Sequence, residues 1–116
     1  MIEIKTQAEI ESMRKASRVV AEVLFQLRSR VKPGVSTAEL DKFAEKNVRE
    51  MGAVPAFLGY RGYPAALCVS INEEIVHGIP SSRRVIREGD IVSLDMGAVC
   101  DGFYGDAAVT VAVGEI

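Results

Sequence analysis

The chain has 116 residues, of which 48% are hydrophobic and 26% are charged, and its formal net charge is −2 at pH 7. This length and balance predict one soluble domain. The basic residues form no stripe of the kind that binds nucleic acid, and no apolar run approaches the roughly 20 residues that span a bilayer. The N-terminus also lacks the apolar core of a signal peptide, so we expect a cytoplasmic protein that binds neither nucleic acid nor membrane.

Two helices are predicted in the first half of the chain. Each begins at a capping box, in which a hydroxyl residue precedes a glutamate by three positions: Thr6 with Glu9, and Ser36 with Glu39. Apolar residues then recur at steps of three and four, which is typical of amphipathic helices. We expect the first helix to run to about Arg30, before Pro33, and the second to end near Gly52.

The second half of the chain predicts antiparallel strands. Strand-like segments cover residues 65–71, 75–76, 91–99 and 103–113, whereas residues 53–63 are expected to be irregular. Asp101-Gly102 lies between the two longest segments and is a strong hairpin signal. The order of two helices followed by an antiparallel sheet predicts an α+β fold over residues 1–116.

Two aspartates interrupt the apolar runs of this hairpin. A two-residue turn at Asp101-Gly102 places Gly97 opposite Asp106, and it places Asp95 opposite Ala108. Asp95 and Asp106 then lie on one face as diagonal neighbours, about 7–8 Å apart at the backbone. Their carboxylates can converge on divalent metal ions. The alternative is that both are merely solvated, as most aspartates are. Against it, aspartate is depleted in strands.

Two further features carry chemistry but remain open to ordinary structural interpretations. His77 is the only histidine, and it could bind a metal, contact a substrate, or simply lie in a surface loop. The segment 57–64 holds three aromatic residues and two glycines. It could form the wall of an apolar pocket or cover the core. The two cysteines, Cys68 and Cys100, form no CxxC pair, and we expect both to be reduced.

Several motifs together resemble the type I methionine aminopeptidases. The matching segments read FLGYRGYPAALCVSINEEIVHGIP and REGDIVSLDMGAVCDGFYGDAAVTVAVG. The N-terminal segments IKTQAEIESMRKA and VKPGVSTAEL are also similar to the opening helices of that family. The resemblance covers nearly the whole chain. It implies a pita-bread fold built from two similar halves, and metal-dependent removal of the initiator methionine from new polypeptides.

The resemblance also implies roles for individual residues. Asp95 and Asp106 would be ligands of two divalent ions (Co, Mn, Fe or Zn), with Asp106 bridging them. His77 would be a catalytic group that contacts the scissile amide of the substrate. A further set of residues would line the pocket for the methionine side chain: Phe57, Tyr60, Tyr63 and Cys68.

The chain is shorter than members of this family, and residues 1–116 correspond to the N-terminal half. The other half would supply one histidine and two glutamate ligands, so we expect this chain to be an incomplete enzyme that is inactive alone. We expect a homodimer or a complementing C-terminal half as partner, because the apolar runs 91–96 and 109–113 need cover on both sides of the sheet. The alternative is a non-catalytic half that self-associates or binds peptides or proteins.

Overall fold

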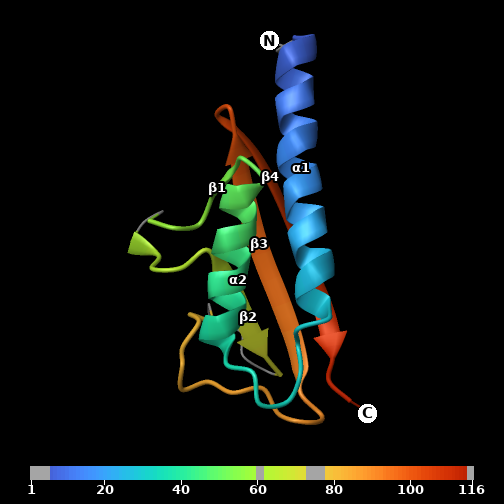
Figure 1. Cartoon of the computed structure of the whole chain (residues 1–116), viewed down its shortest axis with the longest axis vertical. Coiled ribbons are helices and arrows are strands. Elements are labelled where there is room, and N and C mark those ends of the chain that lie inside the picture. Colours follow the sequence, from blue (N-terminus) through green and yellow to red (C-terminus); the bar gives the residue numbers. More distant parts are fainter. Residues whose placement is uncertain (1–5, 60–61, 73–77, 115–116) are drawn as a thin grey trace.

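A computed structural model describes residues 6–59, 62–72 and 78–114. Within these residues the chain forms two helices and a four-stranded antiparallel sheet (Figure 1). The elements follow one another as α1 (Gln7–Arg28), α2 (Thr37–Glu50), β1 (Val54–Pro55), β2 (Leu67–Ile71), β3 (Ile91–Cys100) and β4 (Phe103–Ala112). The predicted α+β order is confirmed. Neither helix is long and apolar enough to cross a membrane.

Both predicted capping boxes are present. The Thr6 hydroxyl accepts a hydrogen bond from the Glu9 backbone N–H at 3.1 Å, and the Glu9 carboxylate accepts one from the Thr6 N–H at 2.9 Å. Ser36 and Glu39 make the same reciprocal pair at the start of α2. These bonds satisfy N–H groups that have no partner inside the helix. Local sequence therefore determines where both helices begin.

Three segments differ in detail from the sequence-based expectation. Helix α1 ends at Arg28 instead of Arg30. The segment expected to be irregular contains β1, because Val54 pairs with Val99 of β3. Strand β2 begins at Leu67 instead of residue 65. The predicted strand at residues 75–76 lies outside the described residues.

Strand β3 is the centre of the sheet. Strand β4 pairs along one side of β3, and β1 and β2 pair one after the other along its opposite side. Within the described chain, β4 pairs only with β3, so its other edge carries no strand. Ten consecutive residue pairs join β3 to β4, which makes this hairpin the longest continuous pairing of the described sheet.

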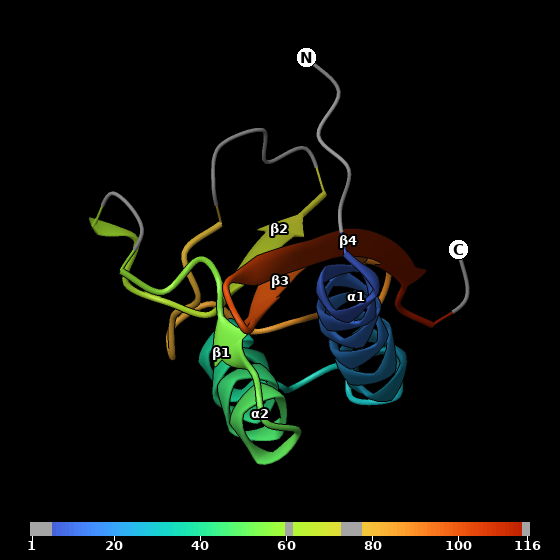
Figure 2. The same cartoon turned by 90° about the horizontal axis from the view of Figure 1, so that it is seen from above.

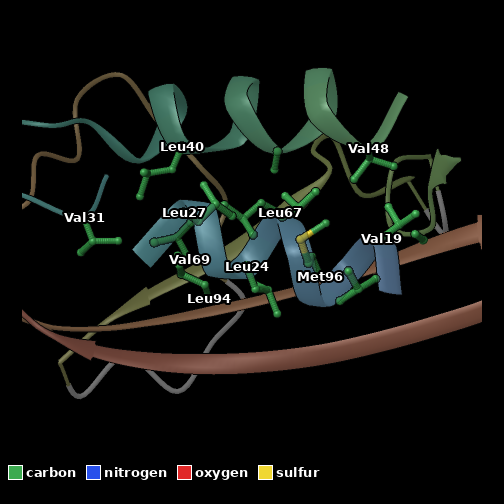
Figure 3. Close-up of a cluster of buried hydrophobic side chains, with 14 of the residues drawn as sticks. Val19, Leu24, Leu27, Val31, Leu40, Val48, Leu67, Val69, Leu94 and Met96 are labelled. Atoms are coloured by element: carbon green, nitrogen blue, oxygen red, sulfur yellow. The ribbon is translucent and has the colours of Figure 1, made fainter. Parts of the chain in front are cut away.

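The core lies between the sheet and the two helices, which occupy the same side of the sheet (Figure 2). Figure 3 shows side chains of α1, α2 and the strands meeting in this layer. Its fully buried members include Leu27, Leu40, Leu67, Leu94 and Met96. Burying a side chain of this size contributes about 1.5–3 kcal/mol. The core therefore depends on contacts between the helical first half and the stranded second half.

The expectation that the apolar runs need cover on both faces is wrong in part. Val92, Leu94 and Met96 all point into the core and are completely buried. Strand residues alternate between faces, and the intervening positions of β3 carry Ser93 and Asp95. The face that no helix covers is therefore mainly small and polar, and it does not require a hydrophobic partner along its whole length.

Asp41 links the helical layer to the beginning of β2. Its Oδ1 atom accepts hydrogen bonds from the backbone N–H groups of Ala66, at 2.9 Å, and Leu67, at 3.0 Å. Burial raises the pKa of this carboxyl above its ordinary value of 3.8, although the two N–H donors oppose the change. Ala66 and Leu67 are buried, so these N–H groups depend on Asp41 as their acceptor.

We expect Asp41→Ala to lower the free energy of unfolding by about 1–3 kcal/mol, because it leaves buried N–H groups without an acceptor. Asp41→Asn keeps an acceptor oxygen and is the matched control, for which we expect a smaller loss. Urea denaturation followed by circular dichroism measures both. Equal losses in the two variants would contradict the proposed role of the oxygen.

The same residue predicts a pH dependence. The folded-state pKa of Asp41 is raised, so the folded protein binds its proton more readily than the unfolded chain does. Its contribution to stability is therefore greatest below pH 3.8 and falls as the pH rises through the raised folded-state pKa. In Asp41→Asn this decrease should be missing from the pH profile of the unfolding free energy.

Candidate metal centre

The candidate site is built on the β3–β4 hairpin. Its turn residues, Asp101 and Gly102, have φ values of 51° and 84°. Glycine adopts positive φ without strain, and aspartate is one of the few other residues that tolerates it. The two-residue turn sets the register, in which Gly97 pairs with Asp106 and Asp95 pairs with Ala108. The predicted register is confirmed.

Asp95 and Asp106 consequently lie on the same face of the sheet. This is the face opposite the helices, because Leu94 and Met96, on either side of Asp95, point into the core. Both residues are exposed. The surroundings nevertheless desolvate the Asp95 carboxyl and raise its pKa, and the neighbouring charge of Asp106 raises it further. A carboxylate whose charge is disfavoured by a neighbouring carboxylate is a favourable place for a cation. Their oxygen atoms suit hard divalent ions such as Mn²⁺.

Gly97, which pairs with Asp106, lets residues 56 and 57 pack closely against β3. A Cβ atom at this position would lie 3.1 Å from the Ala56 Cβ and 3.4 Å from the Phe57 Cε1. The Ala56 N–H also donates a hydrogen bond to the Gly97 carbonyl at 3.0 Å. Ala56, which immediately precedes the aromatic segment 57–64, is thus fixed against β3, the strand that carries Asp95. Glycine permits this close approach of two backbone segments.

The structure brings most of the described pocket residues near the aspartates. Cys68 of β2 pairs directly with Asp95, so the two side chains share one face. The rings of Phe57 and Tyr63 meet edge to face, with centroids 6.3 Å apart. The Tyr63 hydroxyl donates a hydrogen bond to the Leu67 carbonyl at 3.0 Å. Burial raises the pKa of Tyr63, and the nearby Cys68 raises it further, so this phenol stays neutral and acts as a donor.

Two predicted site residues, Tyr60 and His77, lie outside the described residues. In the described part of the chain, no group of three or more His, Cys, Asp or Glu residues could hold a metal ion. The two aspartates are thus part of a ligand set at most. A site selective for one transition metal normally needs more ligands than two.

The sequence analysis did not identify Asp41, the residue of α2 that holds the start of β2 in place. Asp41 fixes Ala66 and Leu67, which immediately precede Cys68. Its position in the first half of α2 is that of an ordinary polar helix residue. No short motif joins it to β2, so only the tertiary structure shows the contact.

Comparison with protein families matches residues 11–116 to metallopeptidase family M24. The chain belongs to this family. Membership of M24 agrees with the pair of aspartates on the uncovered face, since metallopeptidases use metal ions held by side chains of this kind.

The resemblance to methionine aminopeptidases is confirmed among curated relatives of this M24 chain. It is 54% identical to the methionine aminopeptidase of Clostridium acetobutylicum over 116 residues, which are 100% of this chain and 46% of that protein. Identity to methionine aminopeptidase 1 of Bacillus subtilis is 50%, again over 100% of this chain and 46% of the relative. The chain therefore spans about half the length of these relatives.

Solved structures confirm the pita-bread fold of this M24 chain. The methionine aminopeptidase of Thermotoga maritima superimposes with a TM-score of 0.94 at 50% identity, over 99% of this chain and 46% of that one. The prolidase of Pyrococcus furiosus superimposes with a TM-score of 0.81 at 27% identity, over 97% of this chain and 32% of that one. The same fold therefore occurs in solved proteins that are named for different substrates.

Proposed function

We propose that this chain forms the N-terminal half of a metal-dependent aminopeptidase that removes the initiator methionine from new polypeptides. The observation that carries the proposal is the placement of Asp95 and Asp106 on the uncovered face of one hairpin. Family membership and the names of the relatives add to it. Nascent chains that begin with methionine are made in the cytoplasm, so a cytoplasmic location fits this substrate.

In this proposal Asp95 and Asp106 would hold divalent ions (Co, Mn, Fe or Zn) through their carboxylate oxygens. Bound metal would polarise the scissile carbonyl and lower the pKa of a water molecule. The chain itself orients the substrate. Phe57, Tyr63 and Cys68 lie beside the pair and suit the thioether of methionine, because sulfur–aromatic contacts contribute about 0.3–1.5 kcal/mol. Tyr60 would line the same pocket, and His77 would contact the scissile amide.

The ligand set in this proposal is completed by residues outside the described part of the chain. Two carboxylates leave divalent ions largely coordinated by water. We therefore propose that residues 1–116 act together with a C-terminal half, or with a second copy of the chain.

We expect weak Mn²⁺ or Co²⁺ binding that depends on Asp95 and Asp106. Isothermal titration calorimetry should detect it in the unmodified chain and lose it in Asp95→Asn/Asp106→Asn, because these substitutions remove both charged ligands and preserve side-chain size. Asp101→Asn is the matched control. It removes a carboxylate from the same hairpin, and asparagine tolerates the positive φ of Asp101. Equal binding by all three proteins would show that the ions lie elsewhere.

We expect the 116-residue chain alone to release little or no methionine from a Met-Ala-Ser peptide, since its ligand set is incomplete. Adding the C-terminal half of the Clostridium acetobutylicum relative should produce release that a chelator stops. The product can be followed by chromatography. Chelator-sensitive release by the unmixed chain would contradict the claim of incompleteness, and release by a mixture with Asp95→Asn/Asp106→Asn would contradict the assigned ligands.

The edge of β4 that carries no strand among the described residues supports the association of this chain with a partner. Unpaired strand edges tend to pair with other strands, and no lysine or proline interrupts β4. Tyr104 is 69% exposed and Ile91 is 44% exposed, and both lie on the uncovered face. These features support a partner that adds a strand to β4 and covers this small apolar area.

We expect light scattering at micromolar concentration to give a mass above that of the monomer. A Tyr104→Lys/Ala112→Lys variant places charge along the edge strand and should shift the mass towards the monomer. Thermal unfolding provides the control for folding of the variant. A stable monomer of the unmodified chain would contradict the association.

A further inference from the structure

A second surface lies on the helical side of the molecule, opposite the face that carries the aspartates. A cavity of about 970 Å³ opens between the end of α1 and the second half of α2. Its lining includes Phe25 and Arg28 from α1, Arg30 from the following turn, and Phe43 and Lys46 from α2. A neighbouring cavity of about 600 Å³ shares Arg30 with it. We call this combined surface the interhelical groove.

The interhelical groove is positively charged although the whole chain is negative. Its lining contains four cations, Arg28, Arg30, Lys32 and Lys46, and two carboxylates, Glu39 and Glu50. The local formal charge is therefore +4 − 2 = +2, against −2 for the chain. Arginine side chains can bind carboxylates through two parallel hydrogen bonds. The groove thus presents donors that suit an acidic ligand.

The two arginines are available for such contacts. Within the described residues, neither Arg28 nor Arg30 makes an ion pair. The Arg30 guanidinium lies 3.9 Å from the centroid of the Phe43 ring, so its position is held from one side by an aromatic face. Lys46 approaches Glu50 at 3.9 Å, but both side chains are mostly exposed, and pairs of this kind are weak.

The groove also offers an apolar contact. Phe25 is 69% exposed on a helix whose other large apolar residues are mostly buried. Together with the partly buried Phe43, it lines the same cavity as Arg28 and Arg30. Exposed aromatic and arginine residues are enriched in the regions of protein interfaces that contribute most to affinity.

We propose that the interhelical groove binds an acidic peptide segment of a partner protein. Carboxylates of the segment contact Arg28 and Arg30, and an apolar side chain packs against Phe25 and Phe43. A peptide fits better than a nucleic acid because its apolar side chains can pack against Phe25 and Phe43, whereas a nucleic acid presents a continuous row of phosphates. The site lies on the opposite side of the sheet from Asp95, so binding there is separate from the proposed peptidase function.

Fluorescence anisotropy with the full 116-residue chain tests this proposal. The probe is a fluorescein-labelled peptide that repeats Glu-Glu-Leu-Phe, and the comparison probes are a peptide with lysine in place of glutamate and a single-stranded RNA. We expect only the acidic peptide to bind, and we expect added salt to weaken its binding. Phe25→Ser and Arg28→Glu should each weaken it roughly tenfold.

The matched control is Arg18→Glu, which reverses an exposed charge on α1 outside the groove lining and should leave the affinity unchanged. Thermal unfolding confirms that each variant is folded, and Phe25→Ser retains the test if Arg28→Glu unfolds, because Phe25 is largely exposed. The proposal is overturned if the acidic peptide does not bind, if RNA binds more tightly, or if Arg18→Glu weakens binding as much as the groove variants do.

Discussion

The turn at Asp101-Gly102 sets the direction of every side chain in the central hairpin. Both residues have positive φ, which closes the hairpin in two residues and aligns ten consecutive pairs of β3 and β4. A shift of one residue in β3 would exchange its two faces. Leu94 would then leave the core, and Asp95 would point at the helices. One local turn therefore determines both the packing of the core and the position of the candidate ligands.

The two faces of the sheet are consequently specialised. Helix α1 approaches β4 so closely that a Cβ atom on Gly105 would lie 2.7 Å from the Ser17 backbone nitrogen. At this position the backbone of α1 fills the space beside the sheet, so Gly105 cannot carry a side chain unless the helix shifts. The opposite face carries mainly small and polar residues, apart from Ile91 and Tyr104. The Ser93 and Thr110 hydroxyls lie 3.3 Å apart on it. Ligands can reach this face without disturbing the core, because the hydrophobic contacts that stabilise the fold are made elsewhere.

The features that could be predicted from sequence are those with local signals. The capping boxes, the hairpin turn and the period of two in β3 each involve residues close in the chain, and all are confirmed. Asp41 contacts residues 25 and 26 positions away, and β1 forms only because β3 is beside it. Such contacts leave no local pattern. The roles assigned to Tyr60 and His77 stay predictions, since both lie outside the described residues.

The aspartate pair also shows how a candidate site can oppose stability. The pKa of Asp95 is raised by desolvation and by Asp106, so the folded chain without a cation disfavours the doubly charged state. A raised folded-state pKa means that this contribution to stability decreases as the pH rises through it. Aspartate is depleted in strands in general, and stability alone would favour a neutral residue at one of the two positions. The pair of carboxylates on one face is therefore a feature that folding alone does not require.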